Sequence, residues 1–223
     1  MPISIIVVIA YKLIINKLYK FLDNSKIMNK IKEKQNSFFY YLSKKLNMKI
    51  LGLDPGTNIL GYAIIEIINK KIELEHSGIV DLRSEDNDYK KLQKIFNTIK
   101  ELINKYHPNE CAIESPFYGK NAQSMLKLGR AQGVAIAAIL QSSLSVVEYA
   151  PRKIKLSITG NGNASKEQVA KMVESILNTK INFKTFDQSD AIAIAICHFF
   201  NIDKNVNKQY FSWSDFARKK GLI

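Results

Sequence analysis

The sequence has few of the residues that build disulfide frameworks and zinc centres. Cys111 and Cys197 are its two cysteines, each inside an apolar stretch and without a CxxC partner. We expect both to be small core residues in a reducing compartment. The three histidines, His76, His107 and His198, are not spaced as in a metal finger. A histidine-rich zinc enzyme is therefore not indicated.

Long apolar runs are also missing. No stretch of about 18 uncharged apolar residues occurs in the 223-residue chain, so no conventional membrane span is expected. The chain is still 46% hydrophobic, which is enough to bury a substantial core. We expect one folded domain with appendages.

Acidic residues are outnumbered by basic ones, 20 against 33, which gives a formal net charge of +13. Such an excess indicates a polyanionic partner, with nucleic acid as the first expectation. The first 47 residues carry nine lysines and two acidic residues and so contribute about +7 of this total. The rest of the chain is only moderately basic.

Composition divides the chain into three segments. Residues 1–47 are a basic extension, which is either an amphipathic arm or translated upstream sequence with Met48 as the true start. Residues 48–202 are expected to form the folded domain. Residues 203–223 are a basic tail that contains aromatic residues.

The periodicity after Met48 predicts three consecutive strands and then a series of helices and strands. Strands are predicted at 49–54, 58–68, 70–83, 110–115 and 143–150, and helices at 89–106, 122–142, from Ser165 onward and from Asp187 onward. The order β-β-β-α-β-α-β-α-α is typical of an α/β protein with the ribonuclease H-like (actin-like) fold, a mixed five-stranded sheet flanked by helices.

Four acidic residues follow this pattern. Asp54 and Glu114 each end an apolar strand, and Asp187 and Asp190 stand three apart on one face of a helix. Carboxylate oxygens suit Mg²⁺, and nuclease sites gather such ligands from distant segments. Two ions about 4 Å apart can activate the attacking water and stabilise the leaving 3′ oxygen when a phosphodiester is cut.

Each acid also has a simpler explanation. Asp54 begins an Asp-Pro-Gly turn sequence, Asp187 fits a helix N-cap, and Asp190 is then a first-turn acid favoured by the helix dipole. Glu114 has no comparable explanation, since it directly follows a buried strand. The coincidence of all four favours a metal site.

Aromatic and basic residues accompany the acids. Phe117 and Tyr118 follow Glu114 on a predicted loop, where they could stack on unpaired bases or pack on the core. Arg152, Lys155 and Lys166 flank a Gly-Asn turn. They suit phosphate contacts, although solvated lysines on a helix face are the common case.

Four blocks of the sequence resemble the RuvC family of bacterial Holliday junction resolvases, over about residues 48–200. They are GLDPGTNILGYAII, AIESPFYGKNAQSMLKLGRAQGVAIAA, EYAPRKIKLSITGNGNASKEQV and DQSDAIAIAICH, in this order. The resemblance implies that Asp54, Glu114, Asp187 and Asp190 bind metal, and some members have histidine at the place of Asp187. It also implies that Phe117 stacks on a base.

The resemblance further implies that Lys155 and Lys166 steady the phosphates near the cut. A homodimer would nick two opposed strands of a four-way DNA junction, in recombination and repair, with Mg²⁺ or Mn²⁺ and two ions per site. Its products would carry 5′-phosphate and 3′-hydroxyl ends. The branch-migration proteins RuvA and RuvB would be partners, and the location would be the bacterial cytoplasm, at the nucleoid.

Other functions fit parts of the pattern. An actin-like ATPase or sugar kinase also uses a strand-acid-glycine turn, but it duplicates the domain and needs a second phosphate loop. A DNA-binding module without catalysis has no need for all four acids. A related nuclease that acts on pre-ribosomal RNA or another branched substrate remains an alternative within the fold.

Overall fold

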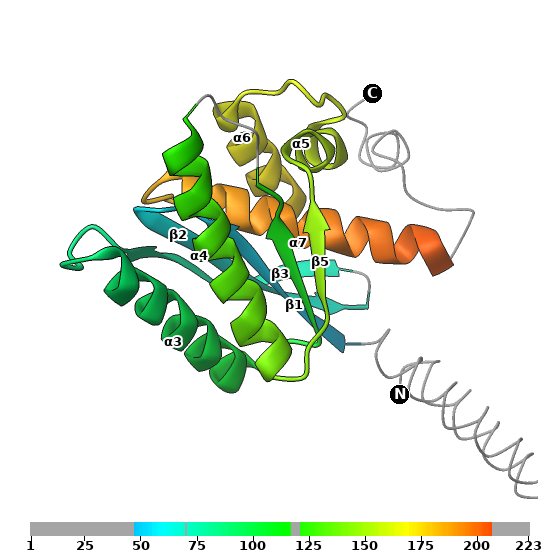
Figure 1. Cartoon of the computed structure of the whole chain (residues 1–223). Helices are drawn as coiled ribbons and strands as arrows, with labels where there is room; N and C mark the ends of the chain where they lie inside the picture. Colours follow the sequence, from blue (N-terminus) through cyan, green and yellow to red (C-terminus); the bar gives the residue numbers. More distant parts are fainter. Residues whose placement is uncertain (1–46, 70, 117–120, 207–223) are drawn as a thin grey trace, which may run out of the picture. The chain divides into compact units, whose positions relative to one another are not determined.

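The structure is a computed structural model that describes residues 47–69, 71–116 and 121–206 (Figure 1). Residues 1–46 lie outside the described residues. None of the described helices is long and apolar enough to cross a membrane.

The centre of the fold is a mixed five-stranded sheet in the order β3-β2-β1-β4-β5. Strands β1, β2 and β3 form an antiparallel meander, and β4 and β5 continue the sheet parallel to β1. The strands are β1 (Asn47–Pro55), β2 (Ile59–Ile68), β3 (Lys71–Asp81), β4 (Glu110–Glu114) and β5 (Val146–Tyr149). The predicted sheet is confirmed.

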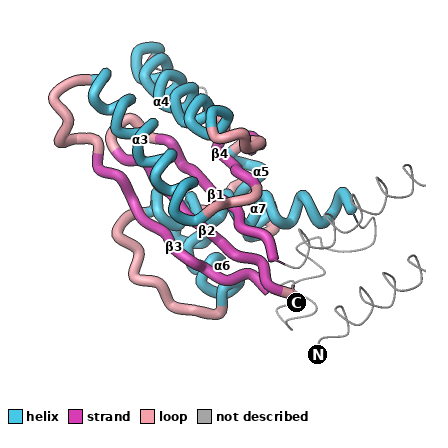
Figure 2. Tube along the Cα trace, turned by 90° about the horizontal axis from the view of Figure 1, so that it is seen from below, coloured by secondary structure: helices cyan, strands magenta, loops and turns pink. Residues whose placement is uncertain are grey.

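Helices cover both faces of this sheet (Figures 1 and 2). The side chains of β1 alternate between the two faces, so that Leu51 and Leu53 belong to one core cluster and Ile50 to the other. Helices α3 (Asp88–Tyr106) and α4 (Ala122–Gln141) pack on the Leu51 face. Helices α5 (Pro151–Thr159), α6 (Lys166–Leu177) and α7 (Phe186–Val206) pack on the Ile50 face. Burial on both faces explains why the β1 sequence is a continuous apolar run.

The helix ends follow the expected capping chemistry in one case and differ in another. Ser165 and Gln168 form the predicted capping box at the start of α6. Helix α7 begins at Phe186, so Asp187 lies in its first turn. The interpretation of Asp187 as the residue that opens this helix is therefore wrong.

Helix α5 is missing from the predicted element order, which has two helices after the fifth strand where the structure has three. Pro151 occupies the first turn of α5, where a missing N–H does no harm. Gly160 ends the helix at φ 75°, a conformation that favours glycine. Ile154 and Ile158, four residues apart, fix it to the core.

Candidate active site

A cavity of about 380 Å³ opens at the carboxyl ends of β1 and β4. All four predicted acids and two of the predicted basic residues line it. Its lining residues are Asp54, Glu114, Asp187, Asp190, Lys155, Lys166, Pro151, Ile154 and Val169. The fold thus brings together residues that lie up to 136 positions apart in the sequence, from Asp54 to Asp190.

Parallel strand pairing places the first two acids side by side. Leu53 of β1 pairs with Ile113 of β4. The next residue is Asp54 on β1 and Glu114 on β4. Both strands point the same way, so both carboxylates lie at the same edge of the sheet. Ligand sites of open α/β sheets lie at this edge.

Two glycines allow α7 to bring the other two acids to the same place. Gly61 pairs with Asp54 across the β1–β2 ladder. A Cβ atom added at Gly61 would lie 2.0 Å from the backbone oxygen of Asp187. One added at Gly52 would lie 2.3 Å from the backbone oxygen of Ala191. Helix α7 therefore rests directly on the strand backbones, with its acidic first turn beside Asp54.

The concentration of acids raises their pKa values. Burial, followed by the charges of Glu114, Asp190 and Asp187, holds the pKa of Asp54 well above its usual range. Burial and then the charge of Asp190 raise the pKa of Glu114 to about 7. Burial also raises the pKa of Asp190, against the opposing effect of Lys166. Carboxylates held so close together in a desolvated place need a cation nearby.

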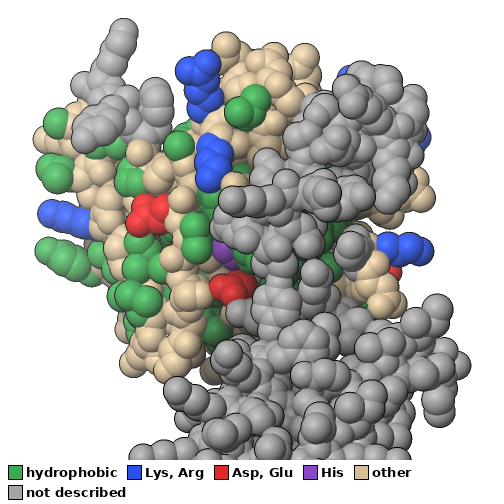
Figure 3. All heavy atoms as spheres, turned by 90° about the vertical axis from the view of Figure 1, so that its right-hand side faces the viewer, with side chains coloured by type: hydrophobic (Ala, Val, Ile, Leu, Met, Phe, Trp, Pro, Cys, Tyr) green, Lys and Arg blue, Asp and Glu red, His purple; other side chains and the backbone are tan. Residues whose placement is uncertain are grey.

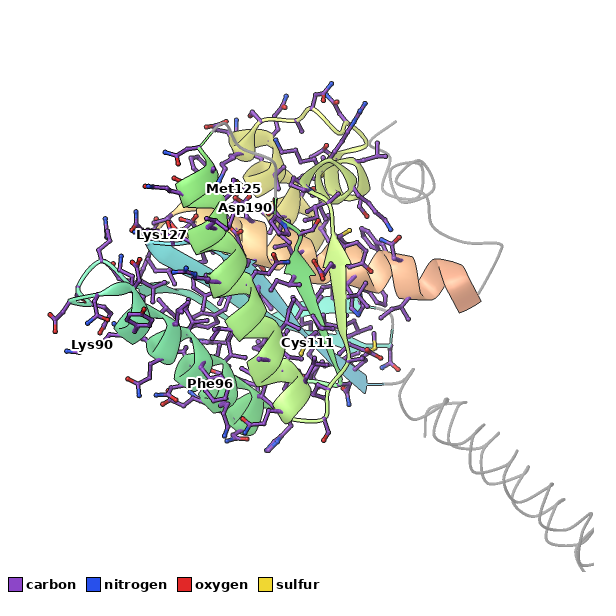
Figure 4. All side chains as sticks on the ribbon, viewed as in Figure 1. Lys90, Phe96, Cys111, Met125, Lys127 and Asp190 are labelled. Carbon is purple, nitrogen blue, oxygen red and sulfur yellow. The ribbon has the colours of Figure 1, made fainter. Side chains whose placement is uncertain are left out.

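One such cation comes from the chain itself. The Lys166 ammonium donates a hydrogen bond to Asp190 Oδ2 at 2.8 Å. The Lys166 side chain is 53% exposed, whereas that of Asp190 is 17% exposed. The lysine therefore reaches from solvent into the cavity to neutralise one of four carboxylates. Figure 4 labels Asp190, which lies near the carboxyl end of β4 and below α6.

The donor set fits a hard divalent cation. Among the described residues that line the cavity, the possible metal ligands are carboxylate oxygens, which Mg²⁺ and Mn²⁺ prefer. Within the described ranges, no three acidic, histidine or cysteine residues are already grouped closely enough to hold a metal ion. The four carboxylates instead share the cavity with the Lys166 ammonium, which is bonded to Asp190.

The shifted pKa of Glu114 leads to a prediction about stability and pH. The metal-free folded protein binds more protons than the unfolded chain between pH 4.5 and about 7, the two pKa values of Glu114. We therefore expect its free energy of unfolding to fall as pH rises through this window, by up to about 3 kcal/mol at 1.36 kcal/mol per pKa unit. A bound cation favours the carboxylate form and should flatten this dependence.

Thermal unfolding from pH 5 to 8, with a chelator and with magnesium, measures this dependence. Glu114→Gln is the informative variant, since it removes the titrating group with little change in volume. If the free energy of unfolding of the Glu114→Gln variant fell equally steeply with pH in the presence of chelator, Glu114 would not be its cause.

The remaining predicted residues lie elsewhere. Phe117 and Tyr118 fall outside the described residues, so their predicted stacking on bases stays a prediction. Arg152 does not line the cavity, and its side chain packs against the loop after α5, where a Cβ added at Gly162 would meet Arg152 Cγ at 2.7 Å. Lys155 and Lys166 do line it, and their contacts with phosphates stay a prediction.

Gln132 is a polar residue near the site that the sequence pattern did not reveal. It is 4% exposed on α4. Its amide nitrogen donates to Glu148 Oε2 at 2.8 Å and approaches the backbone oxygen of Glu114 at 3.4 Å. The side chain thereby ties α4 to β4 and β5. A glutamine within a run of small apolar residues is the only signal for this role in the sequence.

The fold and the acid-lined cavity are those of a ribonuclease H-like nuclease. The profile of the family described as "Crossover junction endodeoxyribonuclease RuvC" matches residues 50–198. Proteins of this description from Christiangramia forsetii and Bacteroides fragilis are 51% and 50% identical to the chain, over 76% of its length and 89% and 92% of theirs.

A solved structure is also similar. The Thermus thermophilus RuvC structure has a TM-score of 0.65 and 28% identity, over 71% of this chain and 97% of its own. The chain belongs to the RuvC family of crossover junction endodeoxyribonucleases. It is thus a nuclease, and the nucleases of this family are metal-dependent.

Proposed function

We propose that the chain resolves four-way DNA junctions by hydrolysing one phosphodiester in each of two opposed strands, in recombination and repair. The observation that carries this proposal is the convergence of four carboxylates and two lysines on one cavity. A Thermus thermophilus relative, 28% identical, has been solved "in complex with Holliday junction substrate". The products would carry 5′-phosphate and 3′-hydroxyl ends, which a ligase can rejoin.

Asp54, Glu114, Asp187 and Asp190 would hold the metal, which we infer to be magnesium, with manganese as a substitute and two ions per site. A metal bound there would supply Lewis acidity for the attacking water and for the leaving 3′ oxygen. Burial and the charge of Asp190 raise the pKa of Glu114 to about 7, so this carboxyl is partly protonated near neutral pH without metal, and a bound cation would favour its carboxylate form.

The two lysines have separate tasks. Lys155 lines the cavity from α5 and provides a positive charge that attracts a backbone phosphate. Lys166 pairs with Asp190, and this pairing holds its ammonium inside the cavity before DNA arrives. When a cation neutralises Asp190, Lys166 is free to donate to a phosphate oxygen. The apolar side chains of Ile154 and Val169 exclude water beside it.

We infer that the enzyme acts as a homodimer, because paired cuts in a two-fold substrate require paired sites. Helix α4 offers a suitable surface. Its exposed residues include a stripe of small and apolar ones: Ala122, Leu126, Gly129, Gly133, Ala137 and Leu140. Leu126 and Leu140 are 66% and 56% exposed, and a Cβ atom at Gly129 or Gly133 would meet nothing within 4 Å. Two such helices can approach closely through their glycines.

This surface gives a prediction that separates assembly from folding. The double substitution Gly129→Leu/Gly133→Leu fills open space in the single chain, so its fold should remain intact. At a close helix contact the leucines would clash, and we expect dimerisation to weaken by about 100-fold or more. Sedimentation analysis against concentration measures the change. Lys171→Leu on α6 is the control, and a variant that dimerises like the wild type would exclude this face.

Cleavage of a synthetic four-way junction tests the function itself. We expect symmetric nicks in two opposed strands with magnesium, and little cutting of a linear duplex built from the same arms. Sequencing gels of each labelled strand give the cut positions, and ligation of the products checks their ends. Equal cutting of the linear duplex would contradict the assignment of junctions as the substrate.

We further infer that RuvA and RuvB are partners and that the enzyme works in the cytoplasm at the nucleoid, because branched chromosomal DNA is located there. Membership of the RuvC family supports both inferences. Co-purification of the three proteins on a junction would test the first of them.

A further inference from the structure

A second cavity, of about 170 Å³, lies beside the turn that follows β1. Its walls come from three parts of the chain: residues 56–58 of that turn, the first two turns of α3, and the N-terminal half of α4. Three basic side chains line it, namely Lys91, Lys127 and Arg130. Among the described residues of its lining, Asp88 is the one acidic residue.

The charges in this cavity do not balance. Lys127 pairs with Asp88 at 3.0 Å, so the charge of this acid is already neutralised. Among the described residues, the side chains of Lys91 and Arg130 have no hydrogen bond or ion pair. Two cations from two different helices thus line one small cavity without an anion. Such an arrangement attracts an anion of matching size.

This convergence differs from other parts of the surface. In the face that Figure 3 shows, basic side chains of the described residues are interspersed with acidic and hydrophobic ones. Elsewhere on α3, Lys90 and Lys94 are each paired with an acid, and Lys100 and Lys105 lie over the aromatic rings of Phe96 and Tyr106. Figure 4 labels Lys127, which lies on the side of α4 toward the start of α3.

The second cavity and the acid-lined cavity are formed in part by residues that are close together in the sequence. Gly56, in its wall, comes two residues after Asp54, and two residues span at most about 7 Å. The turn between the cavities is fixed, since Leu82 N–H donates to Asn58 O at 2.8 Å. A Cβ at Gly56 would lie 2.2 Å from the backbone oxygen of Ile59. One DNA strand carries a phosphate about every 3.4 Å along the helix axis, so both cavities lie within reach of neighbouring phosphates.

We propose that this second cavity binds a backbone phosphate of the junction DNA, a few nucleotides from the phosphate held at the acids. This proposal rests on the junction-cutting function proposed above. Lys91 and Arg130 donate to the phosphate oxygens, while Lys127 stays paired with Asp88. The fixed turn transmits the position of the bound strand to Asp54, so that the contact sets the register of the cut.

Salt dependence of junction binding, measured with a chelator so that no strand is cut, tests the proposal. The double substitution Lys91→Ala/Arg130→Ala should weaken binding about tenfold at low salt, as expected for loss of charge-assisted hydrogen bonds. The slope of the logarithm of the binding constant against the logarithm of salt should become shallower by about 0.9, the value for one phosphate. Alanine keeps both positions helical.

Lys100→Ala/Lys105→Ala is the matched control, since it removes the same charge from the far half of α3. It should leave the slope unchanged. An unchanged slope in the cavity variant, or an equal change in the control, would overturn the proposal. So would a competition experiment in which inorganic phosphate binds the cavity of the wild type without reducing junction binding. A wild type that does not bind junctions would instead remove the proposed function itself, and the phosphate contact with it.

Discussion

Asp54→Asn is expected to abolish junction cutting, with a loss of about 1,000-fold or more, while junction binding is retained. Asp54 lines the acid-lined cavity, where burial and then the charges of Glu114, Asp190 and Asp187 raise its pKa. Asparagine keeps the size and the turn-forming ability of the residue but removes the charge that a metal requires. Single-turnover cleavage of a labelled junction and a binding assay measure both quantities.

The same substitution should have the opposite effect on stability. In the metal-free protein the carboxylate of Asp54 is desolvated and surrounded by like charges. Removing that charge should raise the free energy of unfolding by about 1–3 kcal/mol, the range for an uncompensated buried polar group. In a chain of this size each kcal/mol shifts Tm by about 2–4 °C. Magnesium should stabilise the wild type and have less effect on the variant.

These two effects separate a metal ligand from a turn former. If Asp54 only shaped the turn, the variant would cut normally and would be no more stable than the wild type. Asp86→Asn is a suitable control, because Asp86 is exposed and pairs with Lys90 on the surface of α3. Its removal should change cutting and stability little.

The sequence predicts that the acidic residues lie together, because the cause of their convergence is local. Asp54 and Glu114 end short apolar runs, and the pairing of parallel strands then places them together with no further information. Asp187 and Asp190 share a helix face through their spacing alone. The fold follows from the same periodicities, since a meander followed by α/β units fits few sheet orders.

What the sequence does not predict depends on contacts between distant segments. Helix α5 has a proline start and a glycine end, but its nine residues give too short a periodic pattern for a clear prediction. The pairing of Gln132 with Glu148 joins α4 to β5 and has no local signature. The convergence of Lys91 and Arg130 likewise depends on how α3 and α4 pack on each other.

Gly61→Ala is expected to reduce both stability and cutting strongly, although it adds one methyl group. The added Cβ would lie 2.0 Å from the backbone oxygen of Asp187 and 2.7 Å from its carbonyl carbon. A backbone cannot move aside as a flexible side chain does, so the start of α7 must shift away from β2. Overpacking of this kind costs about 1–3 kcal/mol, and the cost should be at the upper end here.

The shift would also separate the catalytic acids. Asp187 and Asp190 move with α7, whereas Asp54 stays on β1 opposite residue 61. A displacement of about 1 Å at an active site can reduce a rate 100-fold, and we expect a loss of this size in junction cutting together with weaker metal affinity. Chemical denaturation, metal titration and single-turnover cleavage measure the three effects.

Gly129→Ala is the matched control for the effect on stability alone, since Gly129 lies on the proposed dimer surface and its substitution can also affect cutting. Its added methyl group meets nothing within 4 Å on the exposed face of α4. Alanine in place of a helical glycine should stabilise the helix by about 0.5–1 kcal/mol. The same substitution thus has opposite expected effects on stability at the two positions. The difference arises because the new methyl group meets a backbone at residue 61 and open space at residue 129. Normal cutting by the Gly61 variant would show that α7 can position its acids without direct contact between its backbone and the sheet.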